Sequence, residues 1–180
     1  MNTTSNPTSA GLFALKMGVL FSAISIALTT IFFAAGLIHS GRDPASFIPL
    51  LVNAILASVM IKNYRDKQAG GAMSFGSCFG LSFIGFLISG VIGTPFQYLF
   101  MNIWHPGLLQ KQFDATRAQY LAQGMTDEQI DTAMKWMTTS MTNPAIFIIF
   151  GLAGFAFVGA IISLIVAAIC KKDRNAFAGS

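Results

Sequence analysis

The chain has 180 residues, of which 54% are hydrophobic and only 10% are charged, whereas an ordinary soluble domain carries about 25% charged residues. Because a water-facing surface needs those charges, the composition excludes an ordinary soluble globular protein and favours a lipid environment. The net charge of +4 arises from short basic clusters beside apolar runs. These clusters lack interleaved aromatic residues, which argues against a nucleic-acid partner.

The first apolar run covers residues 17–38 without a charged side chain. It follows a polar segment, residues 1–15, that is expected to form a loose tail. A helix of this length reaches about 30 Å, enough to cross the hydrocarbon core of a bilayer. A cleaved signal peptide would need a basic start and a shorter apolar stretch, and Lys16 alone precedes the run. The run therefore predicts a retained transmembrane helix.

Three further apolar runs follow, at residues 44–61, 76–100 and 145–170. The second lies at the lower limit of length for a span, with Pro44 and Pro49 in its first turns, where proline is tolerated. The other two runs are long enough to span with a tilt. The membrane domain is therefore expected over residues 16–174, followed by a short tail at 175–180. An alternative with three spans, in which the second run does not cross, stays open.

The only sizeable polar segment, residues 102–143, separates the last two runs and has the pattern of two amphipathic helices. Gly124 suits the end of the first helix, and residues 126–129 resemble a capping box that begins the second. Three methionines share one face of the second helix, namely Met134, Met137 and Met141. This face either packs on the neighbouring helix or the membrane surface, or it docks a partner protein.

Basic residues gather on one side of the four-span layout, the side that also holds both termini. They are Lys16, Lys62, Arg65, Lys67, Lys171, Lys172 and Arg174. Because cytoplasmic loops carry an excess of Lys and Arg, both termini are predicted to be cytoplasmic, with the 102–143 segment in the periplasm or outside the cell. The three-span alternative places as many basic residues inside, so charge does not separate the two layouts.

Small residues form two strips on the third run. Because small residues let helix backbones approach closely, this helix is expected to lie centrally and to pack against the other spans of the chain. A dimer interface is the alternative. The glycines on these strips are Gly76, Gly80, Gly90 and Gly93.

No Asp, Glu, Lys, Arg or His lies deep within the four runs. Intramembrane ionisable residues mark proton relays and ion pathways, so their absence argues against a proton-coupled pump and against acid–base catalysis in the membrane. Among the uncharged polar residues, Asn53 is the most costly to leave unpaired in lipid. We expect it to form an interhelical hydrogen bond or, alternatively, to contact a ligand.

The sequence contains no recognisable catalytic, cofactor-binding or metal-binding constellation. Cys78 and Cys170 are isolated cysteines, and His39 and His105 lack further ligands at a metal-binding spacing. We therefore expect a protein that is not an enzyme and that holds no cofactor and no metal.

The chain resembles the bacterial four-span membrane proteins grouped as domain of unknown function 4199. The residues that carry the resemblance are 71–76 before the third run, Pro106 after it, 123–130 and Met134 in the polar segment, and Pro144 before the last run. The resemblance extends from about Lys16 onward. It implies the four-span layout and a bacterial membrane, and it implies no activity. We expect that membrane to be the inner, cytoplasmic one.

The sequence thus predicts an all-α polytopic membrane protein, a four-helix transmembrane bundle with an external two-helix amphipathic hairpin. Its first functional interpretation is an accessory, assembly or interaction protein whose partners are the lipid bilayer and itself or another membrane protein. The alternative is a carrier or channel for a neutral or lipid-like solute. A continuous polar cavity beside Asn53 and Ser89 would favour the alternative, and a solidly packed interior would remove it.

Overall fold

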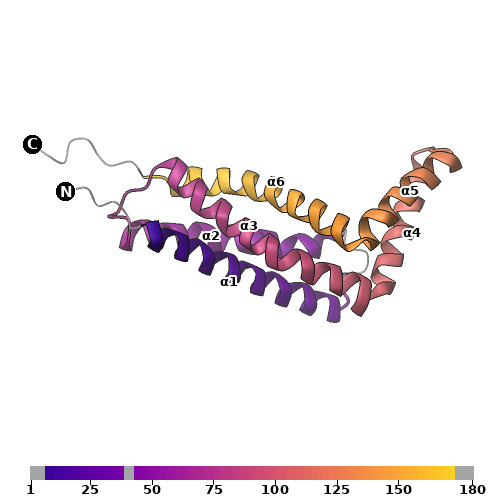
Figure 1. Ribbon diagram of the computed structural model, residues 1–180, viewed down its shortest axis with the longest axis horizontal. Helices are drawn as coiled ribbons and strands as arrows, with labels where there is room; N and C mark the ends of the chain where they lie inside the picture. Colours follow the sequence, from indigo (N-terminus) through magenta and orange to yellow (C-terminus); the bar gives the residue numbers. More distant parts are fainter. Residues whose placement is uncertain (1–6, 39–42, 173–180) are drawn as a thin grey trace, which may run out of the picture.

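The computed structural model of the chain describes residues 7–38 and 43–172. Residues 1–6 of the predicted tail, His39, and the predicted tail at 175–180 lie outside these ranges. The described elements are helices, apart from one isolated β-bridge. In chain order they are α1 (Pro7–Ala34), the 3₁₀ turn η1 (Pro44–Phe47), α2 (Ile48–Lys67), α3 (Phe75–Leu99), the π-helical turn η2 (Phe100–Trp104), α4 (Pro106–Ala122), α5 (Asp127–Thr142) and α6 (Pro144–Cys170) (Figure 1).

Four of the described helical segments are long and apolar enough to cross a membrane: Ala10–Ala34, Pro44–Lys67, Phe75–Trp104 and Pro144–Cys170. The second combines η1 with α2 and has 24 residues, because α2 continues past the end of the predicted run 44–61 to Lys67. Large apolar side chains such as Ile55, Ile149 and Phe157 are exposed on the outside of the bundle. Lipid solvates such a surface and water does not, so the protein is an all-α, multi-pass integral membrane protein.

The start of α1 differs from the sequence-based expectation. Residues 1–15 were expected to form a loose tail, whereas the helix already begins at Pro7. The reason is packing against α2, which no local pattern reveals. Ala14 is fully buried, and the ring of Phe13 lies 4.4 Å from the ring of Tyr64, centroid to centroid.

The end of α1 also differs, because the predicted run 17–38 extends past the last helical residue. Gly36 has a left-handed backbone with φ of +69°. The N–H of Gly36 donates to the carbonyl of Phe33 at 3.0 Å, and the N–H of Leu37 donates to the carbonyl of Phe32 at 2.8 Å. This pair of bonds is a Schellman motif, which satisfies the last carbonyls and ends the helix.

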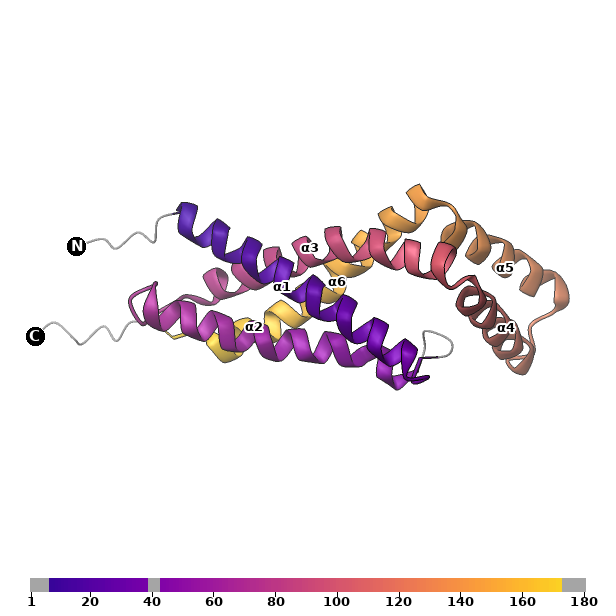
Figure 2. The same cartoon turned by 90° about the horizontal axis from the view of Figure 1, so that it is seen from below.

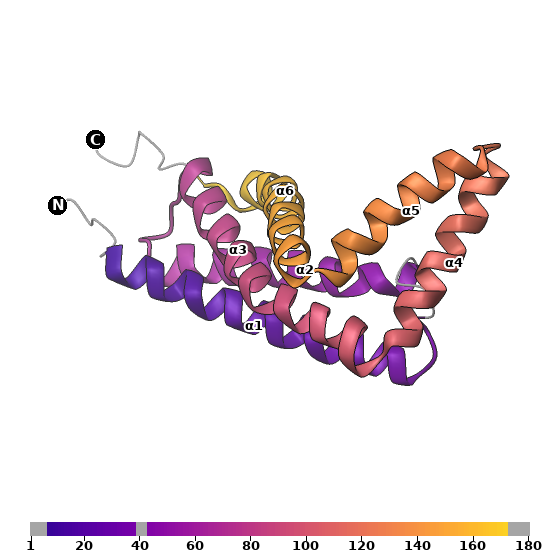
Figure 3. The same ribbon diagram turned by 45° about the vertical axis from the view of Figure 1, so that its right-hand side comes forward.

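Helix α3 lies centrally and makes its most extensive contacts with α6 and α1, as expected from its small-residue strips (Figure 1). The hairpin of α4 and α5 projects from one end of the bundle, called here the hairpin end (Figure 3). The opposite end carries Lys62, Arg65, Lys67, Lys171 and Lys172 and is called here the basic end.

Helices α3 and α6 interlock through large side chains that face glycines. An added Cβ on Gly159 would lie 2.9 Å from the Cβ of Phe86, and one on Gly90 would lie 2.9 Å from the Cβ of Phe155. The contact continues at Gly151, where an added Cβ would lie 2.5 Å from the Cγ2 methyl group of Thr94 on α3. The contacting positions recur every four residues, at 86, 90 and 94 on α3 and at 151, 155 and 159 on α6. This is the spacing of ridges packed into grooves, and the glycines let the two backbones lie close together.

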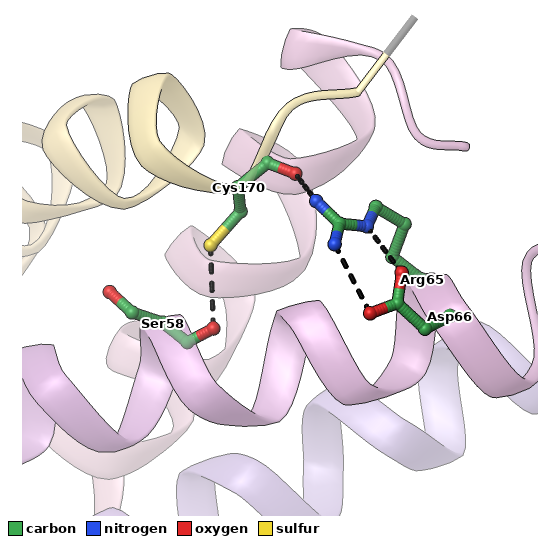
Figure 4. Close-up of polar contacts among 4 residues, drawn as sticks. All are labelled: Ser58, Arg65, Asp66 and Cys170. Carbon is green, nitrogen blue, oxygen red and sulfur yellow. Dashed lines mark hydrogen bonds and ion pairs between the residues drawn. The ribbon is translucent and has the colours of Figure 1, made fainter. Parts of the chain in front are cut away.

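At the basic end, α2 is tied to the last turn of α6 (Figure 4). The guanidinium of Arg65 donates from Nη1 to the carbonyl oxygen of Cys170 at 2.8 Å, and it pairs through Nε with Asp66 at 2.7 Å. The thiol of Cys170 donates to the carbonyl of Ser58 at 3.4 Å. These bonds satisfy an orphan carbonyl at the helix end and join α2 to α6 there.

Toward the hairpin end, α2 separates from α6 and runs beside α1 (Figure 2). Buried side chains form two clusters along the bundle. The cluster in the basic half includes Met17, Phe21, Tyr64 and Phe86, and the cluster at the hairpin end contains Ile38, Phe100, Met101, Leu108 and Leu109. The space between the two clusters holds the site described next.

The external hairpin matches its prediction closely. Gly124 ends the α4 segment with φ of +76°, and Thr126 with Gln129 forms the predicted capping box at the start of α5. Asn143 begins α6, because its side-chain oxygen accepts hydrogen bonds from the N–H groups of Ala145 and Ile146.

Candidate functional site

A cavity of about 320 Å³ lies between the two core clusters, in the hairpin half of the bundle. Phe86 lines it from the basic-half cluster, and Phe100, Met101 and Leu108 line it from the cluster at the hairpin end. Leu108 belongs to α4, so the first turn of the external hairpin contributes to the wall. The volume falls at the lower end of the range of about 300–1,000 Å³ found for small-molecule sites.

The cavity wall combines apolar side chains with six uncharged polar residues. These are Ser25 and Thr29 on α1, Ser46 and Asn53 on the segment from η1 to α2, and Ser89 and Gln97 on α3. None of the residues that line it is an Asp, Glu, Lys, Arg or His. An ionised ligand would therefore lose its hydration without gaining a counter-charge, so the site suits an uncharged one.

Asn53 is the best-positioned polar group of the cavity. It is 4% exposed, and its amide nitrogen donates to the hydroxyl of Ser25 at 2.7 Å and to the carbonyl of Phe21 at 3.4 Å. These bonds link α2 to α1, which is the interhelical bonding expected of this residue. They also fix the orientation of the amide, and its side-chain oxygen, Oδ1, takes part in neither bond.

Two buried polar atoms of the cavity residues have no hydrogen-bond partner within residues 7–38 and 43–172. They are the amide oxygen of Asn53 and the hydroxyl of Ser46. A buried polar atom without a partner costs about 1–3 kcal/mol. A hydroxyl or amide N–H of a bound molecule would remove that cost at Asn53, and the Ser46 hydroxyl can either donate or accept.

A second cavity of about 310 Å³ adjoins the first and is almost wholly apolar. It lies between α2, α3 and α6. Four residues line both cavities, namely Leu50, Phe86, Gln97 and Phe155. The two spaces are therefore neighbours that share part of their wall, and the polar groups are concentrated in the first.

The predicted small-residue strip is divided by the structure. Gly90 packs on Phe155, and Gly93 lines the polar cavity, where an added Cβ would lie 3.9 Å from the ring of the same phenylalanine. An added Cβ on Gly76 or Gly80 would meet no atom of the described chain within 4 Å. The strip thus makes internal contacts in its hairpin half and none at its basic half, which corrects the expectation of packing at Gly76 and Gly80.

The predicted methionine face lies on the external hairpin, away from the cavities. Met134, Met137 and Met141 are all half-buried, and Met141 packs against the hairpin-end cluster. Ile130 of the same helix is fully buried. The face therefore holds the hairpin against the bundle at one end, as packing on neighbouring helices predicts.

The family comparison covers most of the chain. A family model described as "Protein of unknown function (DUF4199)" matches residues 16–172. The chain belongs to the DUF4199 family. Neither the curated proteins nor the solved structures hold a match to this member.

Sequence reasoning missed several residues of the site in this DUF4199 member. Phe155 and the α6 glycines were not singled out, although Gly151 and Gly159 recur at a spacing that places them on one helix face. Ser46 and Gln97 were missed because polar residues near the end of a span usually face the headgroups. Their place in the cavity follows only from the crossing of the helices.

The described residues contain no group of three or more His, Cys, Asp or Glu side chains placed to hold a metal ion. The ring of His105 lies 4.2 Å from that of Phe33 and 4.8 Å from that of Phe100, centroid to centroid. This contact explains the position of the histidine as packing at the hairpin end of the DUF4199 bundle.

Proposed function

We propose that this membrane protein binds an uncharged, hydrogen-bonding ligand in the polar cavity and acts as a carrier for it, without catalysing a reaction. The observation that carries the proposal is the unpaired amide oxygen of Asn53, buried in a cavity whose wall has no charged group. A carrier needs to hold its solute weakly enough to release it, and two or three neutral hydrogen bonds provide that strength.

The cavity favours this function over an accessory or assembly role. A polar space beside Asn53 and Ser89 is the feature that separates the two interpretations, and both residues line the cavity. The accessory role stays a prediction supported by the exposed part of the small-residue strip, at Gly76 and Gly80, where a second copy or another membrane protein would find room.

We further propose a bacterial inner membrane as the location, with the basic end in the cytoplasm and the hairpin on the outer side. The basic side chains at one end support this orientation through their preference for the cytoplasmic face. The test is labelling with a membrane-impermeant maleimide in intact cells. A Thr132→Cys variant on the hairpin should react, and a Gln68→Cys variant at the basic end should react only after lysis; the opposite pattern would reverse the orientation.

The proposed function is tested by extraction of the protein purified from its native membranes. Neutral small molecules that copurify are extracted with solvent and quantified by mass spectrometry per mole of protein. The wild type should carry a reproducible neutral compound, and Asn53→Leu should carry at least fivefold less.

Asn102→Leu is the matched control, because Asn102 is a half-buried asparagine outside the cavity that donates to the carbonyl of Tyr98. It should retain the wild-type amount. Equal amounts in all three proteins, or no neutral compound in any of them, would contradict the proposal. In that outcome, a protein partner recovered reproducibly in the same purification would support the accessory role instead.

A further inference from the structure

The apolar cavity, called here the side groove, lies where α2 and α6 separate toward the hairpin end (Figure 2). Its wall is formed by Leu50 of α2, three residues of α3, and a glycine- and phenylalanine-rich face of α6. The α6 residues are Phe147, Gly151, Gly154, Phe155, Val158 and Gly159. A groove between two spans opens on the hydrocarbon of the bilayer, so its natural content is an apolar chain and not water.

Phe155 stands between the side groove and the polar cavity. Its Cβ lies close over Gly90, its side chain is 38% exposed, and it lines both spaces. Gln97 lies on the same boundary and brings an amide to it. A single molecule that occupies both spaces would thus pass from an apolar wall to a wall of hydroxyl and amide groups.

The side groove also contains one buried polar group of its own. Thr94 is 1% exposed, and its hydroxyl has no hydrogen-bond partner in the described part of the chain. Together with the unpaired amide oxygen of Asn53, it gives each space one buried hydrogen-bonding group in the residues that line it. The remaining groove wall is apolar, so the polar part of a ligand belongs in the cavity.

We propose that the ligand is a neutral amphiphile, with a hydroxyl- or amide-bearing head in the polar cavity and one apolar chain in the side groove. This inference rests on the proposed function. Each space is about twice the size of a cavity of about 150 Å³ that holds one benzene ring. The head and the enclosed part of the chain therefore each have roughly a dozen non-hydrogen atoms.

Selection of the ligand depends on its head and not on its chain. The bilayer solvates an apolar chain as well as the groove does, so moving the chain from lipid into the groove gains little. The hydrogen bonds to Asn53 and its neighbours then distinguish the ligand from bulk phospholipids, whose charged heads the uncharged cavity disfavours. The apolar chain of the ligand determines its entry route. Because this chain stays in hydrocarbon throughout, the ligand enters sideways from the membrane between α2 and α6.

The probe for the test is a 12-carbon primary alcohol that carries a diazirine at mid-chain and a terminal alkyne. The full-length protein is placed in phosphatidylcholine nanodiscs, irradiated and digested, and the labelled residues are mapped by mass spectrometry. The probe should label α6 between Phe147 and Val158, and excess unlabelled dodecanol should compete. The corresponding carboxylate probe at pH 8 should label this stretch at least fivefold less.

A pair of glycine variants tests the groove itself. Gly154 lines the side groove and an added Cβ there meets no atom within 4 Å, so Gly154→Leu places an isobutyl group at the groove wall from a position with open space. It should reduce labelling of α6 at least fivefold. Gly80→Leu is the matched control, since Gly80 also has open space and lines neither cavity; its labelling should equal that of the wild type.

Uniform labelling of all lipid-facing helices, unchanged by Gly154→Leu or by the charge of the probe, would mean ordinary surrounding lipid and would overturn the inference. Thermal unfolding of both variants separates loss of the groove from loss of the fold. If Asn53→Leu removes the copurified neutral compound while Gly154→Leu leaves labelling unchanged, the amphiphile is wrong and the proposed function stands. If Asn53→Leu changes nothing, the proposed function itself fails.

Discussion

Replacing Asn53 by leucine tests whether this asparagine serves to bind a ligand or to stabilise the fold. The substitution removes two hydrogen bonds, one of 2.7 Å to Ser25 and one of 3.4 Å to the carbonyl of Phe21, and such bonds within membranes contribute about 0.6 kcal/mol each on average. It also removes the unpaired amide oxygen, which costs about 1–3 kcal/mol. The ligand-free variant should therefore be more stable than the wild type by up to about 2 kcal/mol.

The assay is reversible unfolding of the delipidated protein in mixed micelles, followed by the loss of helical circular dichroism. Added ligand should raise the stability of the wild type and leave the Asn53→Leu variant unchanged, since only a protein that binds gains stability from mass action. The order of the two proteins should then reverse. A ligand-free variant that is less stable than the wild type by about 2 kcal/mol or more would show that the asparagine is a structural link, and the reasoning would be wrong.

Three further substitutions, two of them with a matched control variant, test the architecture of the bundle and its hairpin. Arg65→Gln removes the hydrogen bond to the last carbonyl of α6 and should lower the free energy of unfolding by about 1.5–3 kcal/mol. The control, Arg117→Gln, breaks an exposed ion pair of 3.6 Å and should lower it by less than about 0.5 kcal/mol. In the same experiments, Gly151→Ala places a Cβ 2.5 Å from a side chain of α3 and should lower the free energy of unfolding by about 1–3 kcal/mol. The control, Gly154→Ala, enters open space and should leave it nearly unchanged. Equal effects of the two substitutions would contradict the close approach of α3 and α6. Thr126→Ala removes the α5 cap and should cost about 1 kcal/mol, seen as faster amide exchange at the start of α5 with the bundle unchanged.

The membrane spans were predictable because they depend on a local property, the absence of charge over a length that crosses a bilayer. The caps of the hairpin were predictable for the same reason, since Gly124 and Thr126 act on residues within one helical turn. The boundary of α1 was not, because the burial of Phe13 depends on Tyr64, which follows it by some fifty positions. The end at Gly36 did have a local signal, a glycine in the position of a helix C-cap.

The cavity was not predictable from a single sequence. Asn53 and Ser89 were recognisable as polar groups in apolar runs, but their meeting depends on the angle at which α2 leaves α6. That angle follows from a tie at the basic end, between Arg65 and Cys170, and from the bond between Asn53 and Ser25 nearer the hairpin end. Long-range contacts of this kind leave no periodic pattern along the chain.

The central claim is that an uncharged molecule occupies the space beside Asn53. The most direct measurement is an experimental structure of the protein crystallised from a lipid mesophase with its native ligand retained. Non-protein density should lie within hydrogen-bond distance of the Asn53 amide oxygen and continue past Phe155 into the groove between α2 and α6. A collapsed interior, with side chains filling the space between the two core clusters, would contradict it.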